Sequence, residues 1–207
     1  MINPTAEKLF EQAHPSAQRN VGPIVEAASP LLPSSGLVLE IASGGGYHSA
    51  VLADANPNLT WQPTDPDPDA QGRIARTVSD AALPNLQAPL ELNAGAEVWP
   101  VESAEAILCC NMIHIAPWSA AQGLFAGAGR VLSGGGVLFL YGPFKVGGVH
   151  TAPSNESFQD WLISQNPEWG VRDAEAVDDL GAAAGLSLEQ SIEMPANNML
   201  RVYRRIP

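Results

Sequence analysis

Three consecutive glycines stand between a predicted strand and a predicted helix in VLEIASGGGYHSA (38–50), with Glu40 four residues before them. Gly44, Gly45 and Gly46 can adopt positive φ angles, and a ligand can approach their main chain without meeting a Cβ atom. In an open parallel sheet, ligands bind beyond the carboxyl ends of the strands, where the first strand-to-helix turn often carries glycines. The stretch therefore predicts a nucleotide-like ligand, with a purely steric turn as the alternative.

The charge of Glu40 separates two classes of such ligands. A dinucleotide brings a pyrophosphate, which favours the spacing GxGxxG, whereas Gly44, Gly46 and Ser49 give GxGxxS. A partly buried carboxylate beside a doubly negative pyrophosphate is also electrostatically unfavourable. S-adenosylmethionine carries a sulfonium and an ammonium group, so an acid at the end of the first strand favours this cofactor.

Two further residues are candidates for the nucleoside. Asp65 follows a predicted strand and could accept hydrogen bonds from both ribose hydroxyls. It could equally cap a helix with Pro66 in the first position, and the two roles can coexist. Asn93 follows another predicted strand, and its side-chain carbonyl could accept a hydrogen bond from the adenine amino group. An ordinary turn residue is the alternative there.

The elements that would position these residues alternate along the chain. Apolar runs predict strands, and helical spacing of apolar residues predicts helices between them. The strands are expected at 37–42, 59–64, 89–93, 105–111 and 136–142, and the helices at 49–55, 68–81 and 119–132. Strands alternating with helices predict an α/β fold, in which a parallel sheet has helices on both faces.

Both ends of the chain depart from this alternation. Two runs of strand length, 187–194 and 198–205, are joined by a short turn and predict an antiparallel hairpin. Before them, Asp173 could cap a helix that Gly185 closes. The first 35 residues predict one or two helices, one across 21–32, that pack against the sheet or close over its edge as a lid.

Composition limits the classes of partner. The 207 residues suit a single domain, and the formal net charge of −12 leaves no basic stripe to neutralise nucleic acid or an anionic membrane. Without a targeting segment or a long apolar run, we expect a cytoplasmic protein. Cys109 and Cys110 are interpreted as core thiols. The four histidines form no i, i+4 pair and no CxxC occurs, so no metal site is predicted.

With these residues in place, the chain resembles the class I S-adenosylmethionine-dependent methyltransferases. VLEIASGGG resembles the E/D-x-G-x-G-x-G turn of that family, and RVLSGGGVLFLYG (130–142) resembles the passage before its fifth strand. Several segments are similar to a subgroup of small methyltransferase-like proteins known as domain of unknown function 938. These segments are RNVGPI, TWQPTDPD, CCNMIHIAPW, LYGPFK, HTAPSNESF, NPEWGVRD and EMPANN.

The resemblance implies a Rossmann-like, mostly parallel sheet of seven strands in the order 3-2-1-4-5-7-6, with the last strand antiparallel. It also implies S-adenosylmethionine as the cofactor. Ala42 replaces the usual first glycine of the turn, and Asn93 stands where an acid is common. The implied cofactor-binding residues are Glu40, Ala42, Ser43, Gly44, Gly46, Asp65, Asn93, Ala94 and Asn111.

Methyl transfer is an in-line attack on the sulfonium methyl group, and a general base is optional because some acceptors are already nucleophilic. Candidates for substrate binding lie in loops expected at the ligand edge of the sheet. They are His114, Trp118, Tyr141, His150, Asn155 and Asn197. His114 is also the one candidate base, although a histidine in the apolar context MIHIAPW is more often a core residue.

These observations predict an S-adenosylmethionine-dependent methyltransferase acting on a small molecule. A protein that binds the cofactor as a sensor or accessory subunit, without chemistry, is the first alternative. A nicotinamide-dependent oxidoreductase is a remote alternative. The acceptor and the oligomeric state are left open.

Overall fold

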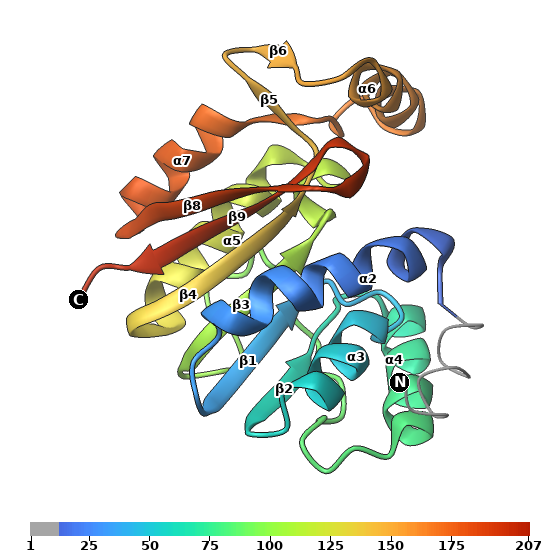
Figure 1. Cartoon of the computed structure of the whole chain (residues 1–207), viewed down its shortest axis with the longest axis vertical. Coiled ribbons are helices and arrows are strands. Elements are labelled where there is room, and N and C mark those ends of the chain that lie inside the picture. The colour runs from blue at the N-terminus through green and yellow to red at the C-terminus, as the bar shows by residue number, and fades with distance from the viewer. Residues whose placement is uncertain (1–12) are drawn as a thin grey trace.

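The structure is a computed structural model of the chain, and it describes residues 13–207. Its centre is a mixed six-stranded sheet in the order β2-β1-β3-β4-β9-β8 (Figure 1). The strands are β1 (Gly36–Ile41), β2 (Leu59–Pro63), β3 (Ala104–Cys110), β4 (Leu132–Gly142), β8 (Leu186–Met194) and β9 (Asn198–Arg205). β1, β2, β3 and β4 pair in parallel, and β9 pairs antiparallel with both β4 and β8. Strand β8 therefore runs in the same direction as β4.

The strand predicted at 89–93 is absent, and that prediction is wrong. In place of a ladder, this part of the chain forms isolated bridges, from Leu86 to Trp61 in β2 and from Leu90 to Thr64 just after it. Pro89 has no N–H group to donate to a ladder, which explains why a continuous strand does not form. The six remaining strands keep the order implied by the resemblance once its third strand is removed.

Helices cover both faces of the sheet and bury two apolar cores. One core contains side chains of α2 (Pro15–Ala28), α3 (Tyr47–Ala55) and α4 (Pro68–Ala81), and the other contains side chains of α5 (Trp118–Val131) and α7 (Ala174–Ala183). The alternation of side chains along a strand divides β4 between them, since Leu138 and Leu140 enter the α5 core whereas Val137 and Phe139 enter the α3 core.

Helix α2 begins six residues earlier than the helix predicted at 21–32 and ends four residues earlier. His14 caps it by accepting a hydrogen bond from the N–H of Ser16, and Pro15 takes the first helical position. Pro23 lies inside the helix, which explains why the sequence suggested a later start. The first part of the predicted lid, residues 1–12, lies outside the described residues.

Two capping predictions have different outcomes. Asp173 caps α7 as predicted, accepting a hydrogen bond from the N–H of Glu175. The cap of α4 is Asp67, which accepts from the N–H of Asp69, and the alternative in which Asp65 caps a helix beginning at Pro66 is wrong. Both positions are Asp-Pro pairs, so the local signal could not separate them.

A second, three-stranded sheet was not predicted. It has the order β6-β5-β7, and its strands are β5 (Phe144–Val146), β6 (Val149–His150) and β7 (Arg172–Asp173). With α6 (Pro153–Gln165) it forms the end of the molecule next to the turn between β8 and β9, at the top of Figure 1. Short 3-10 helices complete the described chain: η1 (Ser29–Leu31), η2 (Met112–His114) and η3 (Pro195–Asn197). Within residues 13–207, every helix is too short or too polar to cross a membrane.

Candidate functional site

The turn between β1 and α3, residues 42–46, has an open main chain. Ala42, Gly44 and Gly46 have φ angles of 56°, 62° and 75°. A Cβ atom added at Gly44 or Gly45 would meet no atom within 4 Å, so the turn leaves free space beside these residues. At Gly46, a Cβ atom would lie 3.1 Å from Ile74 Cγ2, because α4 packs against that side of the turn.

Hydrogen bonds fix the turn to the end of β2. The N–H of Ser43 donates to the carbonyl oxygen of Thr64 at 2.8 Å, and the Thr64 hydroxyl donates to the carbonyl oxygen of Glu40 at 2.8 Å. The N–H of Gly44 donates to Asp65 Oδ2 at 3.0 Å, and Asp65 Oδ1 accepts from the N–H of Asp67 at 3.0 Å. Asp65 thus lies directly beside the glycines.

Glu40 is buried beneath the turn rather than exposed beside it. Its carboxylate accepts a hydrogen bond from the Ser49 hydroxyl, and His48 Nδ1 lies 3.6 Å from its other oxygen. The opposite nitrogen of His48 is 2.8 Å from Asn20 Oδ1, so this chain of contacts connects β1, α3 and α2. Asn20 also forms a hydrogen bond with the side chain of Tyr141 in β4. The site is therefore held by four separate elements.

A pocket of about 760 Å³ opens over the turn, between the first turn of α2, the start of α3, helix α4 and the end of β3. Four predicted cofactor residues line it: Ala42, Ser43, Gly44 and Asn111. The remaining lining residues in the described part of the chain are Ala13, His14, Ser16, Ala17, Gly45, Tyr47, His48, Arg73, Arg76, Thr77, Cys110 and Ile115. Asn111 has a φ angle of 61° and donates its N–H to the carbonyl oxygen of Tyr141, which holds it at the carboxyl end of β3.

The other predicted cofactor residues lie outside this lining. Glu40 is buried beneath the turn, Gly46 ends the turn against Ile74 of α4, and Asp65 is at its side. Asn93 is exposed, and its Oδ1 accepts the N–H of Gly95 at 2.9 Å, as in an ordinary turn. Ala94 is buried, and its carbonyl oxygen accepts a hydrogen bond from Trp99 Nε1. The adenine contact of the 93–94 pair stays a prediction.

The negative charge of Glu40 acts at the pocket wall. Burial and the nearby Glu40 carboxylate raise the pKa of Cys110 well above its usual value, and Cys110 lines the pocket. The same two causes raise the pKa of Cys109 to about 12. Cys109 is in the core as predicted, whereas Cys110 is only partly buried. Because Glu40 disfavours a thiolate here, it favours positive charge in the inner part of the pocket.

The structure also brings together a group of possible metal ligands that the sequence did not indicate. Ligand atoms of Glu40, His48 and Cys110 all lie within 4.8 Å of one another. They come from β1, α3 and β3, so no local spacing such as HxxxH or CxxC connects them. A metal would bind the thiolate form of Cys110, and burial and the Glu40 carboxylate raise the pKa of this thiol. The expectation that the protein uses no metal remains a prediction.

His114, the candidate base, lies in the core. Burial lowers its pKa to about 3, its Nδ1 is 3.4 Å from the carbonyl oxygen of Gly170, and its ring meets that of Phe144 edge to face at 5.2 Å. Its Nε2 is buried without a hydrogen-bond partner among the described residues and faces the main chain of Gly142. His114 does not line the pocket.

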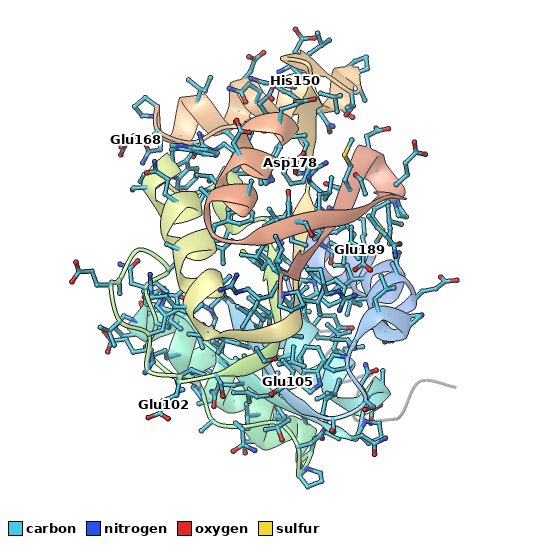
Figure 2. The ribbon with its side chains drawn as sticks, turned by 90° about the vertical axis from the view of Figure 1, so that its left-hand side faces the viewer. Glu102, Glu105, His150, Glu168, Asp178 and Glu189 are labelled. Atoms are coloured by element: carbon cyan, nitrogen blue, oxygen red, sulfur yellow. The ribbon has the colours of Figure 1, made fainter. Side chains whose placement is uncertain are left out.

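The other substrate candidates support structure at the same end of the sheet. Trp118 lies under the guanidinium group of Arg172, 5.6 Å from its ring centre. Asn155 donates to the carbonyl oxygen of Asn197 at 3.0 Å, and Asn197 donates to the Ser154 hydroxyl at 3.0 Å. His150 is in β6, near the upper end of the molecule in Figure 2.

Tyr141 is buried in β4, and burial raises its pKa to about 12. None of the six substrate candidates lines the described pocket.

The pocket lining that sequence reasoning missed comes mainly from α2 and α4. One signal was available, because Arg73, Arg76 and Thr77 have the i, i+3, i+4 spacing that places side chains on one helix face. Nothing local to α4 indicated that this face meets the glycine turn.

The fold defined by these elements is the α/β fold of methyltransferases, with a mixed central sheet. Residues 11–205 match the family described as Protein of unknown function (DUF938), so the chain belongs to this family. The chain superposes with a TM-score of 0.80 on an O-methyltransferase family 2 protein from Planctomyces limnophilus solved with apigenin, at 18% identity, covering 97% of this chain and 62% of that one.

Two further solved structures share the fold. The calicheamicin biosynthesis methyltransferase CalO1, solved with S-adenosylhomocysteine (SAH) bound, has a TM-score of 0.73 at 17% identity, covering 93% of this chain and 54% of that one. The YcgJ protein from Bacillus subtilis has a TM-score of 0.71 at 14% identity, and the match covers 90% of this chain and 98% of that one. The chain thus spans little more than half the length of the first two and nearly all of the third.

Proposed function

We propose that this protein is an S-adenosylmethionine-dependent methyltransferase that acts on a small molecule. The proposal is carried by the open main chain of Gly44 and Gly45, which lines a pocket. The buried carboxylate of Glu40 acts electrostatically on the inner wall of this pocket, at Cys110. An open turn accommodates a nucleoside-sized ligand, and the carboxylate favours a cationic one over a pyrophosphate. The methyltransferase fold and the ligand in CalO1 support the same cofactor.

Several residues fit this cofactor. Ala42, Ser43, Gly44 and Asn111 would contact it from the pocket wall. Asp65 stands beside the turn, with Oδ2 on the N–H of Gly44 and Oδ1 on the N–H of Asp67. Each carboxylate oxygen can accept more than one hydrogen bond, so Asp65 can hold Gly44 and still accept from a ribose hydroxyl. When bound, the cofactor supplies a methyl group that the acceptor's lone pair attacks, while the bonding electrons stay on sulfur.

The chain's own part in the reaction is to orient the acceptor and exclude water. His48 has one nitrogen facing Glu40 and the other facing Asn20, so neither is free to remove a proton from an acceptor in the pocket. His114 is in the core. Neither of these two histidines is therefore a candidate base, and an acceptor that is already nucleophilic, or one that releases its proton to water, would need none.

Other expectations also stay proposals. The acidic chain and its lack of a basic stripe favour a small-molecule acceptor over a nucleic acid, and they are compatible with a cytoplasmic protein. A cofactor-binding protein without chemistry would need the same turn and pocket. Detection of methyl transfer separates these two functions, whereas cofactor binding alone does not.

A substitution that fills the pocket tests cofactor binding. In Gly45→Leu the new side chain points into open space, so the fold should tolerate it while the pocket is blocked. SAH at 100 times its dissociation constant should stabilise the wild type by about 2.7 kcal/mol and leave the variant unchanged. Gly22→Leu is the matched control, because Gly22 is an exposed position of α2 whose added Cβ meets nothing. Stabilisation by NAD instead of SAH would contradict the proposal.

A further inference from the structure

One face of α4 is fastened to the glycine turn. The Thr77 hydroxyl donates to the carbonyl oxygen of Gly45 at 2.7 Å, and Ile74 is buried against Gly46. Arg73 and Arg76 are on the same side of the helix as Thr77, and all three line the pocket. The two guanidinium groups are therefore held beside the proposed cofactor site by the packing of their own helix.

The charge of this wall is opposite to that of the whole chain. The chain has 22 acidic and 10 basic residues, yet the described pocket lining contains two arginines and no aspartate or glutamate. An acidic protein that lines a concave surface with arginines, and with no acid among the described lining residues, creates a local attraction for anions.

The protein itself leaves these arginines largely unpaired. Arg73 lies 3.8 Å from Asp67, and both side chains are about half exposed, at 50% and 54%, so their pairing is weak. Arg76 forms no ion pair or hydrogen bond with another described residue. By contrast, Arg201 pairs with Asp178, and Arg204 pairs with Glu189 at 2.7 Å. The donors of Arg73 and Arg76 are thus available to a ligand.

We propose that Arg73 and Arg76 bind an anionic group of the methyl acceptor, such as a carboxylate. Guanidinium groups match carboxylates in a two-point geometry, and this inference rests on the proposed methyl transfer. Glu40 disfavours an anion at the inner wall, whereas the arginines attract one at the α4 wall. Opposite charges on the two walls orient the acceptor with its anionic group on α4 and its nucleophilic atom toward the turn, and such positioning accelerates the transfer.

The cofactor carries a carboxylate of its own, so the test must separate the two ligands. SAH retains this carboxylate, and isothermal titration with SAH therefore measures any contribution of the arginines to cofactor binding. The variant is Arg73→Gln/Arg76→Gln. The control is Arg130→Gln/Arg204→Gln, which changes the net charge equally at two positions outside the pocket.

The acceptor is sought in a small-molecule cell extract divided on an anion-exchange resin into retained and flow-through fractions. Each fraction is incubated with the protein and methyl-deuterated S-adenosylmethionine, and labelled products are detected by mass spectrometry. We expect label in the retained fraction, reduced about tenfold or more in Arg73→Gln/Arg76→Gln, with an SAH dissociation constant within about twofold of that of the control. Arg73→Lys/Arg76→Lys should recover part of the labelling.

Label confined to the flow-through fraction would overturn the inference and leave the methyltransferase in place. The inference would also be overturned if Arg73→Gln/Arg76→Gln formed as much labelled product as the wild type. A loss of SAH affinity of about tenfold in that variant would assign the arginines to the cofactor carboxylate instead. If the wild type binds SAH but labels neither fraction, the proposed methyl transfer fails, and the inference fails with it.

Discussion

Asp65 Oδ2 accepts a hydrogen bond from the backbone N–H of Gly44 at 3.0 Å. This bond connects the end of β2 to the glycine turn, and the second carboxylate oxygen accepts from the N–H of Asp67 at the start of α4. Asp65 is only 7% exposed. The predicted ribose acid is therefore also a structural link between the turn and α4.

The first prediction concerns Asp65→Asn, which keeps one acceptor oxygen and loses the charge. We expect it to lose about 1–3 kcal/mol of SAH binding free energy and about 1 kcal/mol of folding stability, because charged acceptors make the stronger hydrogen bonds. Titration calorimetry and urea unfolding measure the two losses. Asp69→Asn, at an exposed position of α4, is the control. Unchanged SAH affinity would exclude Asp65 from the cofactor site.

The second prediction concerns Ala42, which has a φ angle of 56° at the position where the family resemblance implies a glycine. At positive φ, a non-glycine residue destabilises the folded protein by about 1–2 kcal/mol through backbone strain. Glycine avoids this strain but lowers stability by about 0.4–1 kcal/mol, because it gives the unfolded chain more conformational entropy. Ala42→Gly should therefore raise the free energy of unfolding by about 0.5–1 kcal/mol. Ala82→Gly, also at positive φ but at the end of α4, should give a similar gain and no change in SAH binding. Destabilisation of both variants in urea titrations would refute this explanation.

The third prediction separates the charge of Glu40 from its shape. Glu40→Gln keeps the size of this buried side chain and a hydrogen-bonding group for Ser49. S-adenosylmethionine carries the sulfonium charge and SAH does not. The variant should therefore lose about 1–2 kcal/mol more binding free energy for S-adenosylmethionine than for SAH. Calorimetry with both ligands measures the difference. Glu105→Gln is the control, since Glu105 accepts a hydrogen bond from the N–H of Leu37 near the start of β1, away from Glu40. Equal weakening of both ligands would show that the charge does not select the cation.

The fourth prediction concerns acid stability. Burial lowers the pKa of His114 to about 3 from its usual 6.5, so the unfolded chain binds a proton in this range that the folded protein does not. The contribution of His114 to folding stability is therefore fully present above pH 6.5. It is lost as the pH falls toward 3, by about 1.4 kcal/mol per pH unit.

Unfolding in urea between pH 7 and pH 4 measures this slope. His114→Gln should flatten it, while His14→Gln, at an exposed position, should keep it. A wild-type slope in His114→Gln would show that other groups control the acid transition.

The parts of the fold and site that follow from local signals could be predicted. The strand, acid and glycines of 38–46 identified the turn, and Asp173 identified the start of α7. The strand expected at 89–93 did not form because Pro89 interrupts the backbone donors. Helix α2 was placed too late because Pro23 is tolerated inside it.

Much of the pocket wall could not be predicted, because it depends on contacts between distant segments. Arg76 and Cys110 meet at the pocket only through the packing of α4 on the turn and the pairing of β3 with β1. The loops after β4 and β8 were expected to bind substrate. In the structure they also connect to α6, as the bond from Asn155 to Asn197 shows, and their role in substrate binding stays a prediction.

The missing third strand has a consequence for association between molecules. A free strand edge offers unpaired backbone groups to which another chain can add. The irregular segment 85–90 satisfies those groups on β2, since the N–H of Trp61 donates to Asn85, and the N–H groups of Gln87 and Leu90 donate to Trp61 and Pro63. Because this cover is too uneven to continue the ladder, the sheet stops there, and this side of the molecule resists edge-to-edge aggregation.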